Sequence, residues 1–345
     1  MKEVGSQPLL DVSDLRVRFK TDEGSFAYLD RLSFHVQRGE ILGIVGESGS
    51  GKSITCLALM RLLEKNGAMS AASIRFDGEE LAALSERQMD WIRGSRMTMV
   101  FQDAMAALNP VFTIGRQLTE GMRLHLHLDA KAAKARAKRI LRQVGLANPD
   151  EILRAYPHEL SGGMQQRVMI AIALACDPKL LIADEPTTAL DVTIQAQIMN
   201  LLKKLRDERQ MSIILITHDM GLIAEMADRV LVMYAGQLLE ACDLRVLLEA
   251  PAHPYTQLLL ASVPSIEDDP NLPLMAIRGV VPEHYERLEG CRFRNRCPYA
   301  DAACTAAQTL TDMEDGSRVR CWKASEGRIP RLGREEARRL VNGFA

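Results

Sequence analysis

One segment of the sequence has the residue types and the spacing of a phosphate-binding loop: Gly46-Glu47-Ser48-Gly49-Ser50-Gly51-Lys52-Ser53. It follows the short apolar run Ile41–Val45 and precedes a helix predicted from Lys52 to Leu63, which is the strand–loop–helix context that the motif requires. Glycines let such a loop fold around phosphate with its N–H groups pointing inward. We predict that Lys52 reaches the β- and γ-phosphates of a nucleotide and that the Ser53 hydroxyl binds Mg²⁺.

Two carboxylates follow a second apolar run, Leu180–Ala183. A buried strand that delivers an acid at its end is what a second Mg²⁺ ligand requires, so we expect Asp184 to hold Mg²⁺ through water. Glu185 lies one residue beyond the strand and is the candidate general base that polarises the attacking water.

A second anion site is predicted at the start of a helix over Ser161–Cys176. Ser161 is a good N-cap residue, and the glycines Gly162 and Gly163 let backbone N–H groups approach an anion closely. Because the chain contains one phosphate loop, we expect this second site to face a nucleotide held by another subunit.

Four cysteines lie close together near the C-terminus: Cys291, Cys297, Cys304 and Cys321. The sequence shows no export signal, so we expect this cluster to be a metal site rather than a set of disulfides. The spacing lacks the short Cys-x2–4-Cys pairs of zinc sites, and Cys297-Pro298 is typical of iron–sulfur motifs. A [4Fe–4S] cluster, Zn²⁺ and reduced structural thiols remain the alternatives. We expect four nearby arginines to offset the charge of the thiolates: Arg292, Arg294, Arg296 and Arg320.

Composition excludes several classes of protein. The 345 residues carry a net charge of −2, which does not indicate a broad nucleic-acid surface. The longest apolar run, Val168–Cys176, is about half the length that a membrane-spanning helix needs. The N-terminus has no signal peptide, so we expect a cytosolic chain whose role at a membrane is peripheral.

The elements that must hold these residues alternate between strand and helix from residue 161 to residue 233, which predicts a mainly parallel sheet covered on both faces. Prolines crowd the sequence after residue 250, where we place a domain boundary. The predicted domains are a cassette over 8–250, with a helical subdomain at about 103–160, an extension over 251–330 and a tail over 331–345.

These motifs, in this order, closely resemble the ATP-binding cassette (ABC) family over roughly residues 8–250. The resemblance implies an α/β P-loop NTPase with a mainly parallel core sheet, an antiparallel β subdomain, a helical subdomain and a small Cys-rich C-terminal extension. It assigns Gln102 to the Q-loop, where it would also bind Mg²⁺, and His218 to the catalytic switch. Signature residues Ser161, Gly162 and Gly163, with Asp191 of the D-loop, would act on the nucleotide of the other subunit. The family usually has Gln at the position of Met164. Phe19 would stack on adenine, with Tyr28 and Phe26 as rivals.

A narrower resemblance is to the oligopeptide/dipeptide importer ATPases. It rests on His253-Pro254-Tyr255-Thr256, on a C-terminal extension with clustered cysteines, and on Met164. Some members carry a [4Fe–4S] cluster in that extension. The resemblance implies a peripheral ATPase on the cytoplasmic face of the inner membrane, bound to a related second ATPase subunit and two transmembrane permease subunits. A solute-binding protein would deliver di- or oligopeptides. Import of nickel chelates or other small solutes is the alternative, and a soluble ABC ATPase acting on nucleic acid or ribosomes is a more distant one.

Overall fold

The computed structural model describes residues 7–22, 24–188, 190–264 and 275–342. By its internal contacts the chain divides into two compact units, each built from several segments. The first unit consists of Met1–Asp11, His35–Ile41 and Arg75–Ile216, and the second of Val12–Phe34, Leu42–Ile74 and Thr217–Ala345. We describe each unit separately.

A small parallel sheet lies at the centre of the first unit, in the strand order β9-β8-β7. Every residue of its strands is buried, as expected for parallel strands covered on both faces. The strands are β7 (Met97–Val100), β8 (Leu180–Asp184) and β9 (Ser212–Ile216). A short antiparallel pair, β5 (Ser73–Phe76) and β6 (Glu79–Glu80), precedes helix α2 (Glu86–Ile92).

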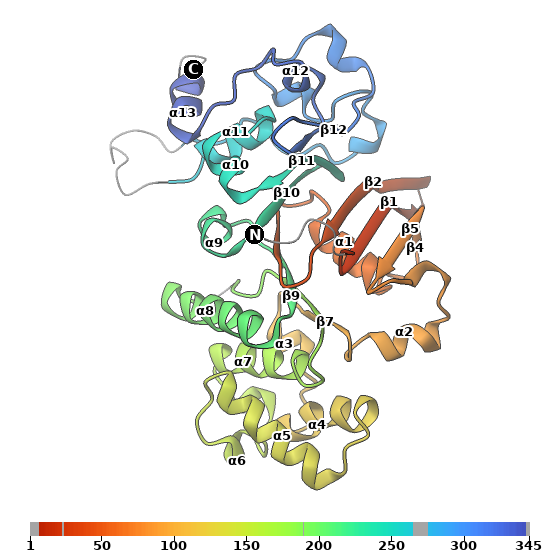
Figure 1. Ribbon diagram of the computed structural model, residues 1–345, viewed down its shortest axis with the longest axis vertical. Coiled ribbons are helices and arrows are strands. Elements are labelled where there is room, and N and C mark those ends of the chain that lie inside the picture. Colours follow the sequence, from red (N-terminus) through yellow and green to blue (C-terminus); the bar gives the residue numbers. More distant parts are fainter. Residues whose placement is uncertain (1–6, 23, 189, 265–274, 343–345) are drawn as a thin grey trace. The chain divides into compact units, whose positions relative to one another are not determined.

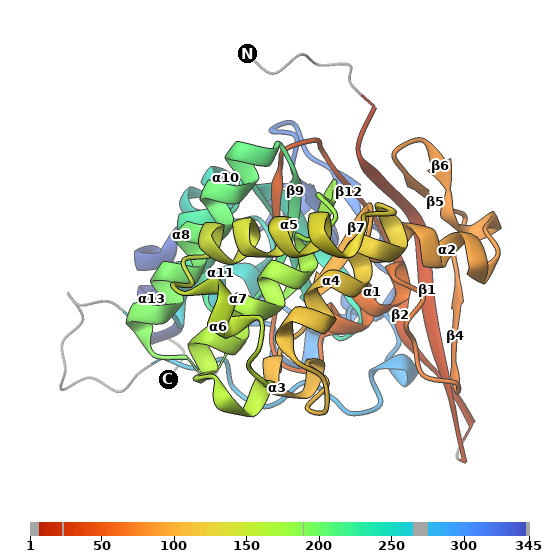
Figure 2. The same cartoon turned by 90° about the horizontal axis from the view of Figure 1, so that it is seen from below.

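Helices make up most of the remainder of this unit. They are α3 (Ala104–Ala107), α4 (Ile114–His125), α5 (Ala130–Gln143), α6 (Pro149–Ile152), α7 (Gly162–Ala173) and α8 (Val192–Arg209). Helices α4 and α5 pack against each other and against α7 (Figure 2). Helix α5 buries Ala133, Ala137, Ile140 and Leu141 and leaves most of its basic residues exposed, so its positive charge belongs to a solvated helix face.

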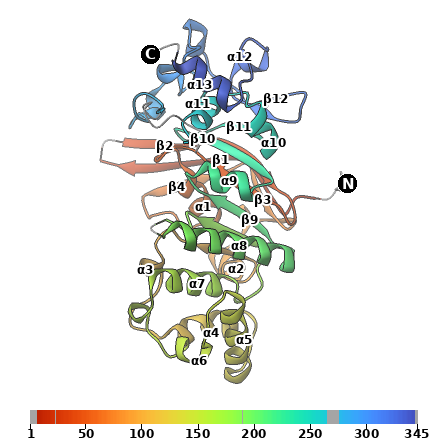
Figure 3. The same cartoon turned by 90° about the vertical axis from the view of Figure 1, so that its left-hand side faces the viewer.

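The second unit contains an antiparallel sheet near the N-terminus, drawn in red and orange in Figure 3. Long strands β1 (Leu10–Thr21) and β2 (Gly24–Val36) are neighbours, and β4 (Gly67–Ser70) pairs with β1 on its other side. This sheet matches the antiparallel subdomain that the sequence indicates.

The second unit also has a mixed sheet in the order β12-β13-β11-β10-β3. Strand β3 (Ile41–Val45) pairs in parallel with β10 (Arg229–Tyr234), and the remaining pairs are antiparallel. The added strands are β11 (Gln237–Asp243), β12 (Thr311–Asp312) and β13 (Arg318–Val319). The helices of this unit are α1 (Lys52–Leu59), α9 (Met220–Met226), α10 (Leu244–Glu249), α11 (Pro254–Ala261), α12 (Trp322–Ser325) and α13 (Arg334–Asn342), labelled in Figure 1.

Single 3₁₀ turns complete the described elements. They are η1 (Leu81–Ala83), η2 (Pro157–Glu159), η3 (Tyr285–Arg287), η4 (Arg294–Arg296) and η5 (Ala302–Thr305). Among the described residues, no helix combines the length and the apolar character needed to cross a membrane.

The observed elements agree with the predicted mixed α/β class, and β3 and β8 lie where the apolar runs Ile41–Val45 and Leu180–Ala183 predict strands. Helix α1 is shorter than predicted: it ends at Leu59 rather than Leu63, because Arg61 adopts a left-handed backbone with φ 51°. The extension contributes β13, which pairs with β11, and β12, which pairs with β13, and periodicity does not reveal these contacts between distant residues.

Candidate functional site

The phosphate loop Gly46–Ser53 connects β3 to α1 within the second unit. Gly46 has φ 149°, and a Cβ there would lie 2.1 Å from the Met233 carbonyl oxygen. Gly51 is the N-cap of α1 with φ 98°, and a Cβ there would lie 2.6 Å from Leu29. These two positions therefore require glycine both for backbone conformation and for space.

Lys52 opens α1 and is buried. Its Nζ donates to the carbonyl oxygens of Gly46 at 2.8 Å and Glu47 at 3.0 Å, so the ammonium group lies inside the curve of the loop. Ser53 follows it in the first turn of the helix, which contains no acidic residue. A helix N-terminus with a buried cation and glycine-lined backbone is suited to bind a phosphate chain.

The predicted carboxylates lie in the first unit, at the end of β8. Asp184 is the last residue of that strand and is buried. Glu185 follows with an unusual positive φ of 45°, and its N–H donates to the Ile216 carbonyl oxygen at 2.9 Å. Backbone strain of this kind concentrates at functional sites.

Two neighbours orient the Glu185 carboxylate. Its Oε2 accepts a hydrogen bond from Nε2 of Gln102 at 3.1 Å and another from the Thr188 hydroxyl at 2.9 Å. The structure thus brings together two of the predicted residues of this unit, and Gln102 retains its amide oxygen, an atom type that Mg²⁺ prefers.

The signature segment begins α7 in the same unit. Ser161 occupies the N-cap position, but its side chain makes no capping hydrogen bond, and the residue is exposed. A Cβ at Gly162 would meet nothing within 4 Å. This helix N-terminus therefore faces open space within its unit.

Sequence reasoning missed the role of two glutamines in α7. Gln165 Nε2 donates to the carbonyl oxygens of Pro157 and Leu160, and Gln166 Nε2 donates to the carbonyl oxygen of Pro186 at 2.5 Å. Gln166 thereby ties the signature helix to the residue that follows Glu185. Two buried amides in an apolar helix are the signal that could have indicated these contacts.

The remaining predicted residues lie at loop–helix junctions. Asp191 is the N-cap of α8, and its Oδ1 accepts from the Ile194 N–H at 2.9 Å. His218 is exposed between β9 and α9, in the second unit. The D-loop residue Ala189 lies outside the described residues.

The three candidate adenine-stacking residues fall into two groups. Phe19 and Tyr28 make an edge-to-face contact with centroids 5.3 Å apart, and Tyr28 is 40% exposed. Phe26 instead contacts His284 at 5.7 Å. Tyr285 adds a ring contact with Tyr28 and donates its hydroxyl to the Tyr28 carbonyl oxygen at 3.1 Å, so a residue after position 280 supports this aromatic pair.

All four clustered cysteines line one small cavity together with His253. They are free thiols, and burial is the main cause that raises the pKa of Cys291 to about 11 and that of Cys297 to about 12. Over the residues that the structure describes, no group of three or more His, Cys, Asp or Glu side chains is arranged to hold a metal ion. The four thiols of the predicted centre share this cavity, and their binding of a metal stays a prediction. The other cysteines, Cys56, Cys176 and Cys242, are buried.

Of the four arginines expected to offset the charge of the thiolates, two bind other groups. Only Arg294 lines the cysteine cavity, and Arg320 lies near enough for the charge of Cys291 to raise its pKa, although burial lowers that pKa more. Arg292 instead donates to the Ala235 carbonyl oxygen at 2.5 Å. Arg296 turns away from the cysteines and pairs with Glu47 of the phosphate loop. Both guanidinium groups have acceptors in the cassette part of the chain that sequence spacing cannot reveal.

Comparison with protein families gives two matches. Residues 29–188 match the family described as "ABC transporter", and residues 239–304 match the one described as "Oligopeptide/dipeptide transporter, C-terminal region". The first range contains the phosphate loop, the acids and the signature. The second contains three of the four clustered cysteines.

Individual relatives cover nearly the whole chain. One relative is an ATP-binding protein of Brucella melitensis whose name assigns it provisionally to peptide import. It is 49% identical to this chain over 329 residues, which are 95% of this chain and 97% of the relative. The dipeptide transport ATP-binding protein DppD of Escherichia coli is 47% identical and covers 91% of this chain and 96% of its own length.

Solved structures are similar over the cassette. The ATP-binding cassette MJ0796, as a dimer in a post-hydrolysis state bound to ADP and Pi, matches with a TM-score of 0.62 and 27% identity, over 68% of this chain and 99% of its own. CbiO1 of Clostridium perfringens, part of the ABC transporter complex CbiONQ, matches with a TM-score of 0.58 and 26% identity, over 70% of this chain and 90% of its own.

Proposed function

The chain belongs to the ABC ATPases of oligopeptide and dipeptide transporters, and we propose that it is the ATP-hydrolysing, energy-coupling subunit of a membrane importer for di- or oligopeptides. The observation that carries this proposal is identity of nearly one half to peptide import ATPases over more than nine tenths of the chain. Relatives of that length and similarity share both the cassette and the extension.

In the proposed reaction, Lys52 binds the phosphate chain of ATP and Glu185 accepts a proton from the attacking water. Gln102 and Thr188 hold the Glu185 carboxylate in one orientation, which lowers the cost of positioning the base. Ser53, Gln102 and Asp184 are the proposed ligands of Mg²⁺, which, when bound with ATP, neutralises phosphate charge. We assign His218 as a second group that acts on the γ-phosphate.

We propose that the signature acts on a nucleotide bound by a second, related ATPase subunit. The exposed Ser161 hydroxyl and the open space at Gly162 support this assignment, because neither is used inside the unit. The similar cassette MJ0796 has been solved as a dimer. We assign Asp191, the N-cap of α8, to the same subunit contact.

Membrane permease subunits are the partners of an importer ATPase of this family. We propose that the helices within residues 103–160 bind them, that the chain thereby sits on the cytoplasmic face of the membrane, and that a solute-binding protein delivers the solute. Phe19 and Tyr28, one paired against the other, are the proposed adenine contacts.

The proposal is tested by reconstituting the chain with its permease subunits and binding protein in vesicles. Uptake of labelled dipeptides should require ATP and should stop with Lys52→Ala. A complex that hydrolyses ATP in response to a nickel chelate, and not to peptides, would contradict the peptide assignment while leaving the importer function intact.

We propose that Cys291, Cys297, Cys304 and Cys321 hold a [4Fe–4S] cluster. Support comes from the shared cavity of the four thiols. Cys297-Pro298 and the wide spacing of the four cysteines also favour iron–sulfur over zinc. When bound, the cluster would link segments of a small, loop-rich domain.

Metal analysis distinguishes the alternatives. The anaerobically purified chain should be brown and contain about four irons per chain, and Cys297→Ser should lose the colour. One zinc per colourless chain would contradict the iron–sulfur proposal, and a metal-free preparation with the same stability would leave only reduced thiols.

A further inference from the structure

Glu47, the second residue of the phosphate loop, is held at three separate points within the second unit. Its N–H donates to the Tyr255 hydroxyl at 2.9 Å. Its carbonyl oxygen accepts from the Lys52 ammonium at 3.0 Å and from the Ser50 N–H at 3.2 Å. Its carboxylate forms two parallel hydrogen bonds with Arg296, at 2.9 and 3.0 Å. The beginning of the loop, which also binds the Lys52 ammonium group, is therefore fixed by two residues that lie 208 and 249 positions later in the sequence.

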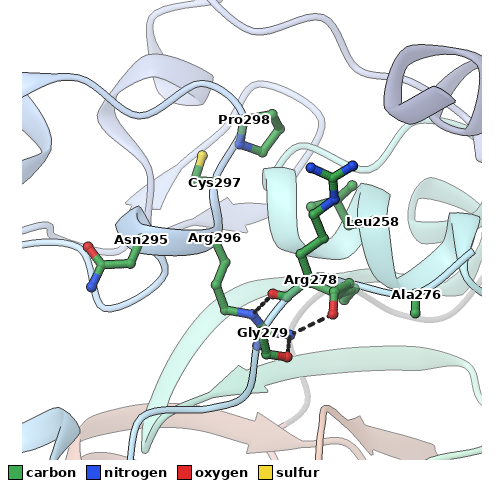
Figure 4. A pocket seen from close by; sticks show the side chains of 9 residues that line it. Leu258, Ala276, Arg278, Gly279, Asn295, Arg296, Cys297 and Pro298 are labelled. Atoms are coloured by element: carbon green, nitrogen blue, oxygen red, sulfur yellow. Dashed lines mark hydrogen bonds between the residues drawn. The ribbon is translucent and has the colours of Figure 1, made fainter. Parts of the chain in front are cut away.

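The Arg296 side chain is buried and is held in one orientation by several hydrogen bonds. Arg296 ends the turn η4 directly before Cys297, and its side chain is only 7% exposed. Its guanidinium also donates to the carbonyl oxygens of Ile277, Arg278 and Gly279, where it forms one wall of a pocket (Figure 4). Its Nη1 donates in addition to the Tyr234 hydroxyl at 3.3 Å. Backbone oxygens on one side and the Glu47 carboxylate on the other leave this group little freedom to turn.

The charge of Glu47 needs this partner. The Glu47 side chain is 27% exposed, and its backbone belongs to a loop whose composition suits a polyanionic ligand. An unpaired carboxylate there would repel the phosphate chain, whereas a bidentate arginine neutralises it with fixed geometry. Lysine would supply the charge but not the two parallel bonds.

We propose that Arg296 is a positioning residue for ATP binding: it neutralises and orients Glu47, and so makes nucleotide affinity depend on the fold of the cysteine-bearing segment. This inference rests on the proposed role of Gly46–Ser53 in ATP binding. Two adjacent residues then connect the cysteine cavity with the phosphate loop. Cys297 lines the cavity, and Arg296 donates hydrogen bonds to the Glu47 carboxylate of the loop.

The test is a double-mutant cycle on the full-length chain, with the dissociation constant of a non-hydrolysable ATP analogue and Mg²⁺ as the readout. Arg296→Met should weaken binding about tenfold to hundredfold, the range of coupled neighbours. Adding Glu47→Gln should restore the constant to within about threefold of the parent value, because the repelling charge is gone. Arg296→Lys should fall between the parent and Arg296→Met.

The matched control is Arg331→Met, which removes an arginine of the same part of the chain that pairs with Asp315 rather than with the loop. It should bind the nucleotide as the parent does. If Arg296→Met binds normally, or if Glu47→Gln alone is as weak as Arg296→Met and the double variant shows no rescue, the inference is overturned.

Lys52→Ala separates this inference from the proposed function. A Lys52→Ala chain that still binds the nucleotide at the parent affinity would contradict the proposed phosphate loop itself. If Lys52→Ala loses nucleotide binding while Arg296→Met keeps the parent affinity, only the proposed role of Arg296 is contradicted.

The connection to the cysteines has its own readout. Cys297→Ser should weaken nucleotide binding when it is introduced into the parent chain. It should have no effect in the Arg296→Met, Glu47→Gln double variant, because the Arg296–Glu47 ion pair is already absent there. Equal weakening in both backgrounds would show that the cysteine affects the loop by another route, and no weakening in either would show that the two regions are independent.

Discussion

Two helix N-termini in this protein have the composition of anion sites, and they are built in opposite ways. The start of α1 is buried, and a Cβ at its N-cap Gly51 would collide with Leu29. The start of α7 is exposed, and a Cβ at Gly162 would meet open space. Hydrogen bonding also differs between the two sites. The Tyr255 hydroxyl, far along the sequence, accepts from the phosphate loop, whereas the Ser161 side chain makes no capping hydrogen bond. An enclosed site suits a ligand held within the chain, and an open one suits a ligand brought by a partner.

The largest effect is expected from substituting Glu185, the proposed general base, which should slow ATP hydrolysis without changing either helix N-terminus. Glu185→Gln should reduce ATP turnover by about 10²–10⁴-fold, the usual contribution of a positioned base, because the amide cannot accept the proton. Nucleotide binding should persist, since the phosphate loop is intact. Steady-state hydrolysis by the assembled complex, with Glu208→Gln on α8 as the control, checks this outcome. Parent turnover in the Glu185→Gln complex would show that another group is the base.

The next prediction compares the two helix starts directly. Gly51→Ala should destabilise the chain by about 1–3 kcal/mol, because alanine must adopt φ 98° and displace Leu29. Gly162 has no positive φ and no atom within 4 Å of an added Cβ, so Gly162→Ala should have the same midpoint of urea unfolding as the parent chain. Urea unfolding of both variants measures the difference. Equal stability of the two would remove the distinction between an enclosed and an open site.

The last prediction concerns α11, the helix that contains Tyr255, whose hydroxyl accepts a hydrogen bond from the phosphate loop. Its N-cap His253 is fully buried, and this burial, with the nearby charge of Arg320, lowers the His253 pKa from 6.5 to about 3. The unfolded chain therefore binds one more proton than the folded chain between about pH 6.5 and about pH 3. Stability present above pH 6.5 is lost as the pH falls through that window, by about 1.4 kcal/mol per pH unit at most.

A matched variant isolates this contribution. His253→Asn keeps a side chain that can cap the helix but does not titrate. Between pH 7 and pH 5, the parent should lose on the order of 2 kcal/mol more unfolding free energy than His253→Asn. Urea unfolding at the two pH values measures this, and an equal loss in both chains would show that His253 does not titrate on unfolding.

The sequence predicted local chemistry well and long-range contacts poorly. The loop Gly46–Ser53 and the acid pair after Leu180–Ala183 are contiguous motifs, so spacing alone located them, and their strands have the predicted bounds. The Arg296–Glu47 pair joins residues 249 positions apart, and no periodicity encodes it. For that reason the sequence associated Arg296 with the neighbouring cysteines and not with Glu47. Strands β11 to β13 were missed because short strands gain their structure from pairing rather than from pattern.

The central claim, that the enclosed site binds nucleotide within the chain and the open one acts on a partner's nucleotide, is tested most directly by ATP-dependent association. The measurement is the molar mass of the Glu185→Gln chain by light scattering, alone and with its second ATPase subunit, before and after ATP is added. We predict that ATP produces a dimer, and that adding Ser161→Arg leaves nucleotide binding intact but abolishes association. Loss of nucleotide binding by the isolated Ser161→Arg chain would contradict the account, because it would place the signature on the chain's own ATP.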